Sequence, residues 1–241
     1  EMQRSLVGSE MCIRDRSNYT GLILTQLISI LKGSPVTNTM LEVATSSNLW
    51  VNLFIMVLCA PVAEELIFRK LLIDRLAQYG EGVAVLFSGL MFGLFHGNLN
   101  QFVYAFVLGL CFGFIYVKTG NIRYTIGLHM LVNFLGSVLG VAILKWLGDD
   151  FLSIASDPAG MMSYMTGNFG KLIVYFIYIF LLLGVAIAGI ILFIVNLKKI
   201  RFLPGMNTLP KGKRFSTTVL NVGMALYMIV WIVIIIVQLF Q

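Results

Sequence analysis

Two adjacent glutamates interrupt an otherwise apolar segment. Glu64 and Glu65 stand in the sequence APVAEELIFR of residues 60–69. A charged side chain at the centre of a membrane helix costs about 2.5–3.5 kcal/mol on insertion scales, so such a pair needs a reason. Arg69 follows Glu65 by four residues, the order that favours a helical ion pair, whereas Glu64 has no basic partner within one turn. The pattern favours a functional role for Glu64 and leaves Glu65 open between pairing and function.

The chain's only two histidines fall in the same middle part of the sequence as these acids. His96 ends the apolar run 92–96. His129 lies four residues before Asn133, so both side chains face the same way on one helix. A single histidine in a helical bundle is more often a hydrogen-bonded structural residue than a catalyst. Here both histidines lie in the part of the chain that holds the paired acids, and with Asn133 they make a convergent set of acid, imidazole and amide.

The elements that position these residues must be membrane helices. Of the 241 residues 59% are hydrophobic and only 12% are charged, about half the share that a soluble domain carries. Because a spanning helix needs about 20 residues, we expect an all-α, polytopic transmembrane bundle of six to seven helices around a central catalytic core. The expected segments are 20–31 (short enough to be the remnant of a longer helix), 49–76, 83–95, 102–117, 126–147, 172–197 and 219–240.

The basic residues indicate the orientation of the bundle. The net charge of +6 does not indicate nucleic-acid binding, because the basic residues lie between apolar segments. They crowd the loop 198–214, which we expect on the cytoplasmic side, while the acidic loop 148–170 should face outward. We therefore expect a multi-pass protein of the cell membrane whose site is more open to the cytoplasm. The three cysteines have no disulfide or metal-binding spacing.

Small residues and one proline indicate where the bundle is tight and where it bends. Gly89 and Gly93, Gly109 and Gly113, and Gly136 and Gly140 form three pairs at a spacing of four, which lets helix backbones approach closely. Pro61, three residues before Glu64, lacks a backbone donor and should kink its helix and free a carbonyl group beside the acid.

The domain organisation is simple. We interpret residues 1–16 as a non-native leader, because SLVGSEMCIRDR resembles a translated sequencing adapter and no signal-peptide pattern is present. Residues 17–241 should form a single membrane-embedded domain with its core at 49–140. No internal repeat or low-complexity linker is present.

Three motifs in order carry a resemblance to a known family. Other intramembrane proteases are disfavoured, since the chain has no His-Glu-x-x-His and no rhomboid-type or presenilin-type glycine motif. The motifs Glu64-Glu65-x-x-x-Arg69, Phe92-x-x-x-His96 and His129-x-x-x-Asn133 resemble the CPBP family, which contains the CAAX prenyl proteases, bacteriocin-processing enzymes and Abi proteins. The resemblance covers about residues 49–140.

The resemblance implies an intramembrane endopeptidase with Glu64, Glu65, His96, His129 and Asn133 in its site and Arg69 as structural support. In the preferred, metal-free mechanism Glu64 activates a water that His96 orients, and His129 and Asn133 donate to the oxyanion. In the alternative, zinc is held by Glu64, His96 and His129. Asn133 favours the first, because an amide is a poor zinc ligand.

Other functions stay open at this point. A catalytically silent scaffold or bacteriocin-immunity factor of the same fold would tolerate loss of the acids, and none is lost here. An ion-coupled transporter would show inverted repeats, which the sequence lacks. The expected partners are the lipid bilayer and a peptide or protein substrate, such as a prenylated C-terminus, a leader peptide or the tail of a membrane protein, and no nucleic acid. The oligomeric state is open.

Overall fold

The computed structural model describes residues 39–148, 151–154, 157–196, 200–207 and 220–240, together with Ile28 and Thr217. Within these residues all regular structure is helical, and five helices are long and apolar enough to cross a membrane. They are Leu49–Tyr79, Leu99–Thr119, Ile122–Leu147, Ala159–Val185 and Val222–Phe240. The predicted all-α transmembrane bundle is confirmed. The leader 1–16 lies outside the described residues, as does the segment 20–31 apart from Ile28.

The first long helix is built from successive segments of different winding. It contains α3 (Leu49–Asn52), η1 (Leu53–Cys59), α4 (Ala60–Glu65), η2 (Leu66–Ile73), α5 (Asp74–Leu76) and η3 (Ala77–Tyr79), and α2 (Thr39–Ser46) precedes it. In η1 and η2 the backbone forms wider π-type turns, such as the bond from the Ala60 amide to the Ile55 carbonyl. Such turns are rare and often occur at functional sites. Here they flank α4, which carries both glutamates.

The antiparallel pair α6 (Glu81–Phe95) and α7 (Leu99–Thr119) forms the most extensive helix contact among the described residues. A Cβ atom added at Gly109 would lie 2.8 Å from the Gly89 Cα atom, and one added at Gly93 would lie 2.9 Å from the Phe106 Cβ atom. The close approach predicted from two of the glycine pairs is therefore confirmed. In the third pair, a Cβ atom added at Gly140 would meet the Tyr178 hydroxyl at 3.1 Å and the Leu135 carbonyl oxygen of its own helix at 3.2 Å, and no backbone atom of a second helix.

The third motif lies on a helix that crosses the bundle without a break. It consists of α8 (Ile122–Asn133), η4 (Phe134–Gly140) and α9 (Val141–Leu147). The Asn121 side chain accepts from the Arg123 amide and caps the start of α8. Gly120, in the left-handed region, ends α7 and makes the turn between the two helices.

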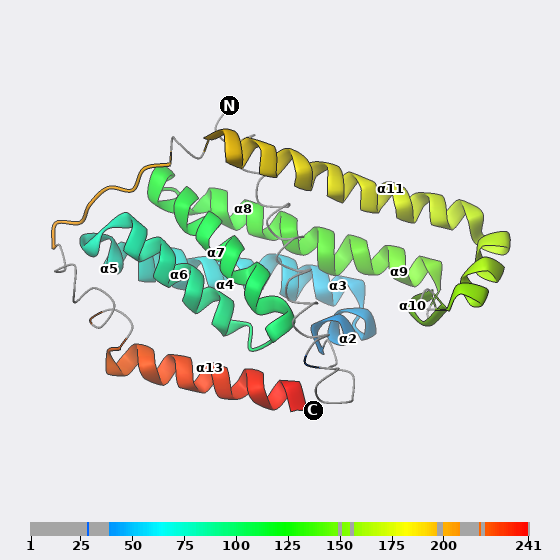
Figure 1. The fold of residues 1–241 in the computed structure, drawn as a ribbon, viewed down its shortest axis with the longest axis horizontal. Coiled ribbons are helices and arrows are strands. Elements are labelled where there is room, and N and C mark those ends of the chain that lie inside the picture. Colours follow the sequence, from blue (N-terminus) through cyan, green and yellow to red (C-terminus); the bar gives the residue numbers. More distant parts are fainter. Residues whose placement is uncertain are drawn as a thin grey trace.

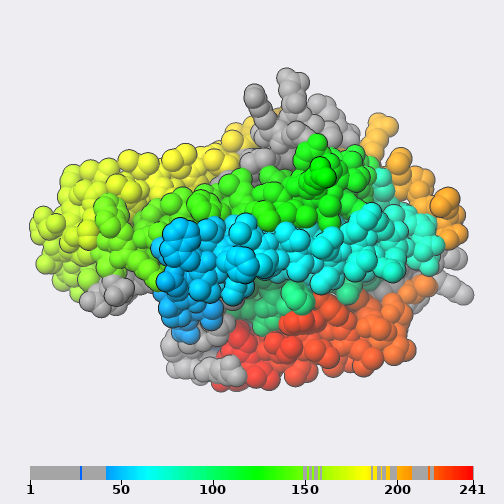
Figure 2. Space-filling view, turned by 180° about the vertical axis from the view of Figure 1, so that it is seen from behind, coloured from blue at the N-terminus to red at the C-terminus, as the bar shows by residue number. Residues whose placement is uncertain are grey.

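Two apolar helices flank this bundle on opposite sides (Figure 1): α11 (Pro158–Asn196) and α13 (Val222–Phe240). Seen from behind, the first long helix runs between the green α8 and α9 and the red α13 (Figure 2). The segment 148–170 is more helical than expected, since α10 (Phe151–Ile154) and the start of α11 fall within it. Asp157 explains the early start, because its carboxylate accepts from the Gly160 amide at 2.9 Å and caps α11.

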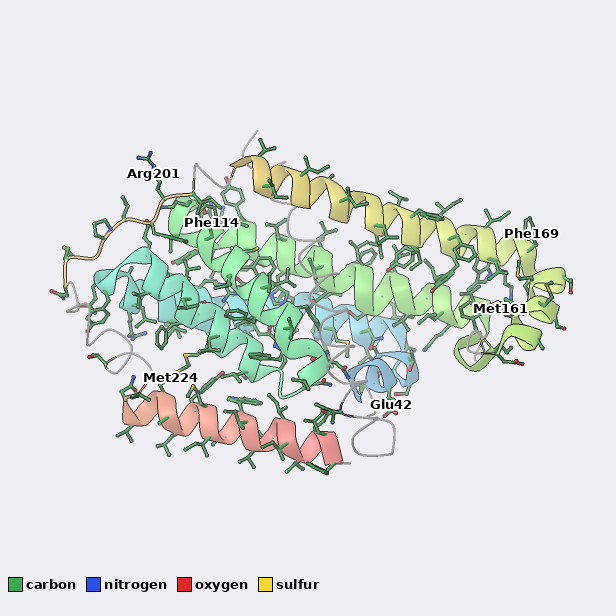
Figure 3. All side chains as sticks on the ribbon, viewed as in Figure 1. Glu42, Phe114, Met161, Phe169, Arg201 and Met224 are labelled. Atoms are coloured by element: carbon green, nitrogen blue, oxygen red, sulfur yellow. The ribbon has the colours of Figure 1, made fainter. Side chains whose placement is uncertain are left out.

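A segment between α11 and α13 contacts the core of the bundle in a way that the sequence did not reveal. Residues 200–207 lie against the turn between α5 and α6, where the Leu203 amide donates to Glu81 Oε2 at 2.8 Å and Glu81 also pairs with Lys118. Gly205 is required here, because an added Cβ would lie 2.2 Å from the Gln78 carbonyl oxygen. Arg201 and Phe114 lie at this end of the molecule, and Glu42, Met161 and Phe169 lie at the other (Figure 3).

Candidate active site

The two glutamates of α4 differ in their surroundings. Glu65 is fully buried and forms an ion pair with Arg69, with 3.0 Å between Oε2 and Nε. The four-residue spacing predicted this pair, and the structure confirms it. The neighbouring Glu64 points to a different set of atoms and keeps 17% of its side chain exposed.

Arg69 is held by a residue that sequence reasoning missed. Its Nη1 donates to the Ser88 hydroxyl at 2.7 Å, and that hydroxyl donates to the Phe68 carbonyl at 2.8 Å. The guanidinium also lies over the rings of Phe92 and Phe112, at 4.8 and 5.6 Å from their centroids. These contacts fix the cation deep in the bundle and thereby fix Glu65. A serine in an apolar run of α6 was the available signal.

His129 lies between the two carboxylates. Its Nδ1 donates to Glu65 Oε1 at 3.1 Å, and its Nε2 faces Glu64 Oε2 at 3.8 Å. The Phe92 and Phe112 rings lie 5.6 and 5.3 Å from the imidazole, between ring centroids. A carboxylate bonded to Nδ1 fixes the ring orientation and the position of the Nδ1 hydrogen. His129 is thus fixed on its Glu65 side and is directed at Glu64 on the other.

Glu64 is the acid that the local structure leaves unused. Its Oε2 is buried, and among the described residues no donor is placed to form a hydrogen bond with it. A buried carboxylate oxygen without a donor is costly, so a stable fold alone does not explain it. Glu64 is available to take a proton.

His96 joins the site through Phe92. Its Nδ1 donates to the Phe92 carbonyl at 2.9 Å, which leaves Nε2 as a hydrogen-bond acceptor. The His96 and Phe92 rings are 4.9 Å apart between centroids, and Phe92 contacts His129 as well. The backbone bond therefore sets the tautomer of a histidine that lies beside the same aromatic ring as His129.

Asn133 binds the backbone of the first long helix. Its Nδ2 donates to the Met56 carbonyl at 2.7 Å. In the π-type register that pairs Ala60 with Ile55, the next donor to Met56 would be residue 61, which is a proline and has no amide hydrogen. The freed carbonyl that the proline predicted is thus Met56, and Asn133 satisfies it with one of its two amide hydrogens.

The six predicted residues are therefore arranged in one region. A continuous chain of contacts joins Glu64, Glu65, Arg69 and His129. Glu64 and His129 are near enough for both side chains to contact one water molecule. His96 is linked to this chain by the Phe92 ring, and Asn133 lies one helical turn after His129.

The alternative zinc site is not assembled in this geometry. Tetrahedral zinc in enzymes takes three protein ligands, and within the part of the chain that the structure describes no three His, Cys, Asp or Glu side chains are grouped to hold a metal. Glu64 and His129 supply two donors near each other, without a third. We therefore derive no step through a metal.

Comparisons with known proteins agree with the motifs. Residues 46–135 match the family model described as Type II CAAX prenyl endopeptidase Rce1-like. This segment contains all six residues above, and the resemblance to the CAAX prenyl protease family is confirmed. No solved structure matches the chain.

Two curated proteins are similar over part of their length. The membrane-embedded CAAX protease MroQ of Staphylococcus aureus (strain USA300) is 26% identical over 151 residues, which are 60% of this chain and 58% of that protein. The putative membrane peptidase YdiL of Bacillus subtilis (strain 168) is 32% identical over 74 residues, 30% of each. The chain thus matches little more than half of the first relative and less than a third of the second.

Proposed function

We propose that this chain, whose residues 46–135 match the Type II CAAX prenyl endopeptidases, is an intramembrane endopeptidase in which Glu64 activates the attacking water. The observation that carries the proposal is the unequal use of two adjacent acids. Glu65 is bonded to Arg69 and His129, while Glu64 faces His129 Nε2 and has no hydrogen bond among the described residues. One acid supports the site and the other is free to react.

The reaction needs a base and a second hydrogen-bond acceptor that hold the two hydrogens of one water. Glu64 takes a proton from the water, and His96, whose Nε2 accepts, holds the second hydrogen of the same water. The water oxygen then bonds to the scissile carbonyl carbon. When the carbon–nitrogen bond breaks, the protonated Glu64 returns its proton to the leaving amine, so the carboxylate is regenerated.

The oxyanion that forms in this step needs hydrogen-bond donors. His129 donates from Nε2 in the form that carries a hydrogen on both ring nitrogens, while its Nδ1 hydrogen stays bonded to Glu65. The second amide hydrogen of Asn133 is the other donor, since the first is used by Met56. Loss of one such donor costs about 10²–10³-fold in kcat.

The substrate is a peptide or protein segment at the membrane. The helices Leu49–Tyr79 and Ile122–Leu147, which carry both glutamates, His129 and Asn133, are long and apolar enough to span a bilayer, so a substrate must enter from lipid or from a membrane surface. We place the protein in the cell membrane, with the site opening toward the cytoplasm, on the distribution of basic residues.

The proposal is tested with the full chain in nanodiscs and three peptides. These are a farnesylated peptide ending in a CAAX box, the same peptide without the lipid, and an apolar leader peptide. We expect cleavage of at least one, measured by mass spectrometry, and equal rates with and without 1,10-phenanthroline. Loss of activity with the chelator and its recovery with zinc would reject the metal-free mechanism. Cleavage of none of the three would favour the silent scaffold.

A further inference from the structure

Gln101, in the first turn of α7, carries a buried polar atom that the fold does not use. Its side chain is only 9% exposed, and its Oε1 has no hydrogen-bond partner among the described residues. A buried acceptor without a donor costs about 1–3 kcal/mol. Such groups are rare in native proteins, so a donor from outside the chain is the natural explanation.

Gln101 lies on the face of α7 that looks into the candidate site. Residues three and four positions further along a helix share its face. Those residues are Tyr104, whose ring lies 6.5 Å from the His96 ring, and Ala105, which is buried against Phe68 and Phe92. Gln101 is therefore the first of three α7 side chains, followed by Tyr104 and Ala105, on the helix face toward His96 and Phe92.

The packing of α6 on α7 sets the height of Gln101 along the site. Gly89 lies opposite Gly109, and one turn on, Gly93 lies opposite Phe102 and Phe106. Continued by one more turn, the same antiparallel register brings His96 to the level of Gln101. The unused oxygen is thus at the height of a histidine that we assign to the reacting water.

We infer that Gln101 is a substrate-positioning residue whose Oε1 accepts a hydrogen bond from a backbone N–H of the bound peptide. The inference rests on the proposed peptidase function. A peptide bond must leave a helix to be attacked, and an extended segment at membrane depth has backbone N–H groups without water to satisfy them. An acceptor beside the attacked bond binds such a segment without regard to its side chains.

The test measures binding in a Glu64→Gln background, where no cleavage interferes. The probe is the farnesylated CAAX peptide and a series of its esters, each replacing one backbone N–H near the expected cleavage position by oxygen. With Gln101 present, we expect one ester to bind about three- to tenfold more weakly than the parent peptide. Gln101→Met should weaken binding of the parent peptide by the same factor and show no further loss with that ester.

Two controls separate positioning from a structural role. Gln78→Met removes an amide at the α5–α6 end, where Gln78 bonds Asn207, and should keep the full ester effect. Gln101→Met should unfold at the same temperature as the protein that keeps Gln101, or higher, because an apolar isostere replaces an unpaired acceptor. In the Glu64 enzyme the variant should raise KM and leave kcat nearly unchanged.

The outcomes distinguish this inference from the proposed function. The inference would be overturned if the ester weakened binding equally with and without the Gln101→Met substitution. It would also be overturned if Gln101→Met left binding of the parent peptide unchanged or lowered the unfolding temperature. A bound water would then be the simplest donor to Gln101 Oε1. Selective ester binding without Glu64-dependent cleavage would support the inference and reject the peptidase. Glu64-dependent cleavage with no ester-selective loss would reject the inference alone.

Discussion

Glu64 and Glu65 are neighbours of the same type, yet their positions on the helix give them opposite environments. Glu65 faces Arg69 and His129 inside the bundle with no exposed surface, and Glu64 faces the other nitrogen of His129. Replacing each acid by glutamine should therefore affect different properties. We expect stability to depend on Glu65 and reactivity on Glu64.

We predict that Glu65→Gln lowers the free energy of unfolding by about 3–5 kcal/mol, because it leaves the Arg69 charge buried without its counter-ion. Glu64→Gln should change it by less than about 1 kcal/mol, since Glu64 makes no hydrogen bond among the described residues. Thermal unfolding in detergent, with Glu42→Gln on exposed α2 as control, measures both. Similar losses for the two acids would contradict this division.

Some contacts within the site were predictable from the sequence, and others were not. The Glu65–Arg69 pair follows from spacing along one helix and was predicted. Ser88 on Arg69 and Asn133 on Met56 join residues 19 and 77 positions apart, so they depend on how neighbouring helices are rotated and shifted. Hydrophobic patterning does not specify that register, and the roles of these two contacts were not predictable.

At the scale of elements, the α6–α7 contact holds His96 in place relative to the rest of the site. Both helices contribute glycines where their backbones meet, and a side chain there would push them apart. The wider turns of η1 and η2 act similarly on the first long helix, since they set the direction in which α4 presents its acids.

We predict that Gly109→Ala destabilises the protein by about 1–3 kcal/mol through overpacking against Gly89. Gly113→Ala, one turn along the same helix, is the matched control, because its Cβ would meet ordinary contacts at 3.4 Å. It should be neutral or slightly stabilising, as alanine favours helix. Chemical denaturation measures the free energy of unfolding of both variants. Equal changes would contradict the close contact between Gly89 and Gly109.

The helices themselves were largely predictable, and their connections were not. Apolar runs predicted four of the five spans with both ends within about four residues, because lipid requires long apolar segments. The start of α11 at Pro158 was missed, since the polar segment around Asp157 resembles a loop until its capping bonds are known. The docking of 200–207 was missed because only the folded α5–α6 turn provides its partners.

At the scale of the whole molecule, the first long helix, α6, α7 and the helix that begins with α8 alternate in direction between two ends (Figure 1). Arg201 lies at the end where α5, α6 and α7 meet, and Met161 and Phe169 lie at the opposite end (Figure 3). On the positive-inside rule we propose that the end with Arg201 faces the cytoplasm.

We predict that a cysteine at position 211 is protected from a membrane-impermeant thiol reagent in intact cells, whereas one at 157 is labelled. Lys211→Cys and Asp157→Cys are made in a chain without Cys12, Cys59 and Cys111. Permeabilised cells serve as the control, where both positions should react. Labelling of position 211 from outside would contradict this orientation. The site would then open toward the outside of the cell.

The central claim is that Glu64 is the base, and the kcat of Glu64→Gln tests it most directly. Glutamine keeps the shape of the side chain but cannot take a proton from water, so we expect a loss of about 10²–10⁴-fold, with the unfolding temperature of the wild type. The measurement is the initial rate of peptide cleavage in nanodiscs, at saturating substrate, for wild type and variant purified side by side. Equal rates, well above the rate without enzyme, would contradict the account.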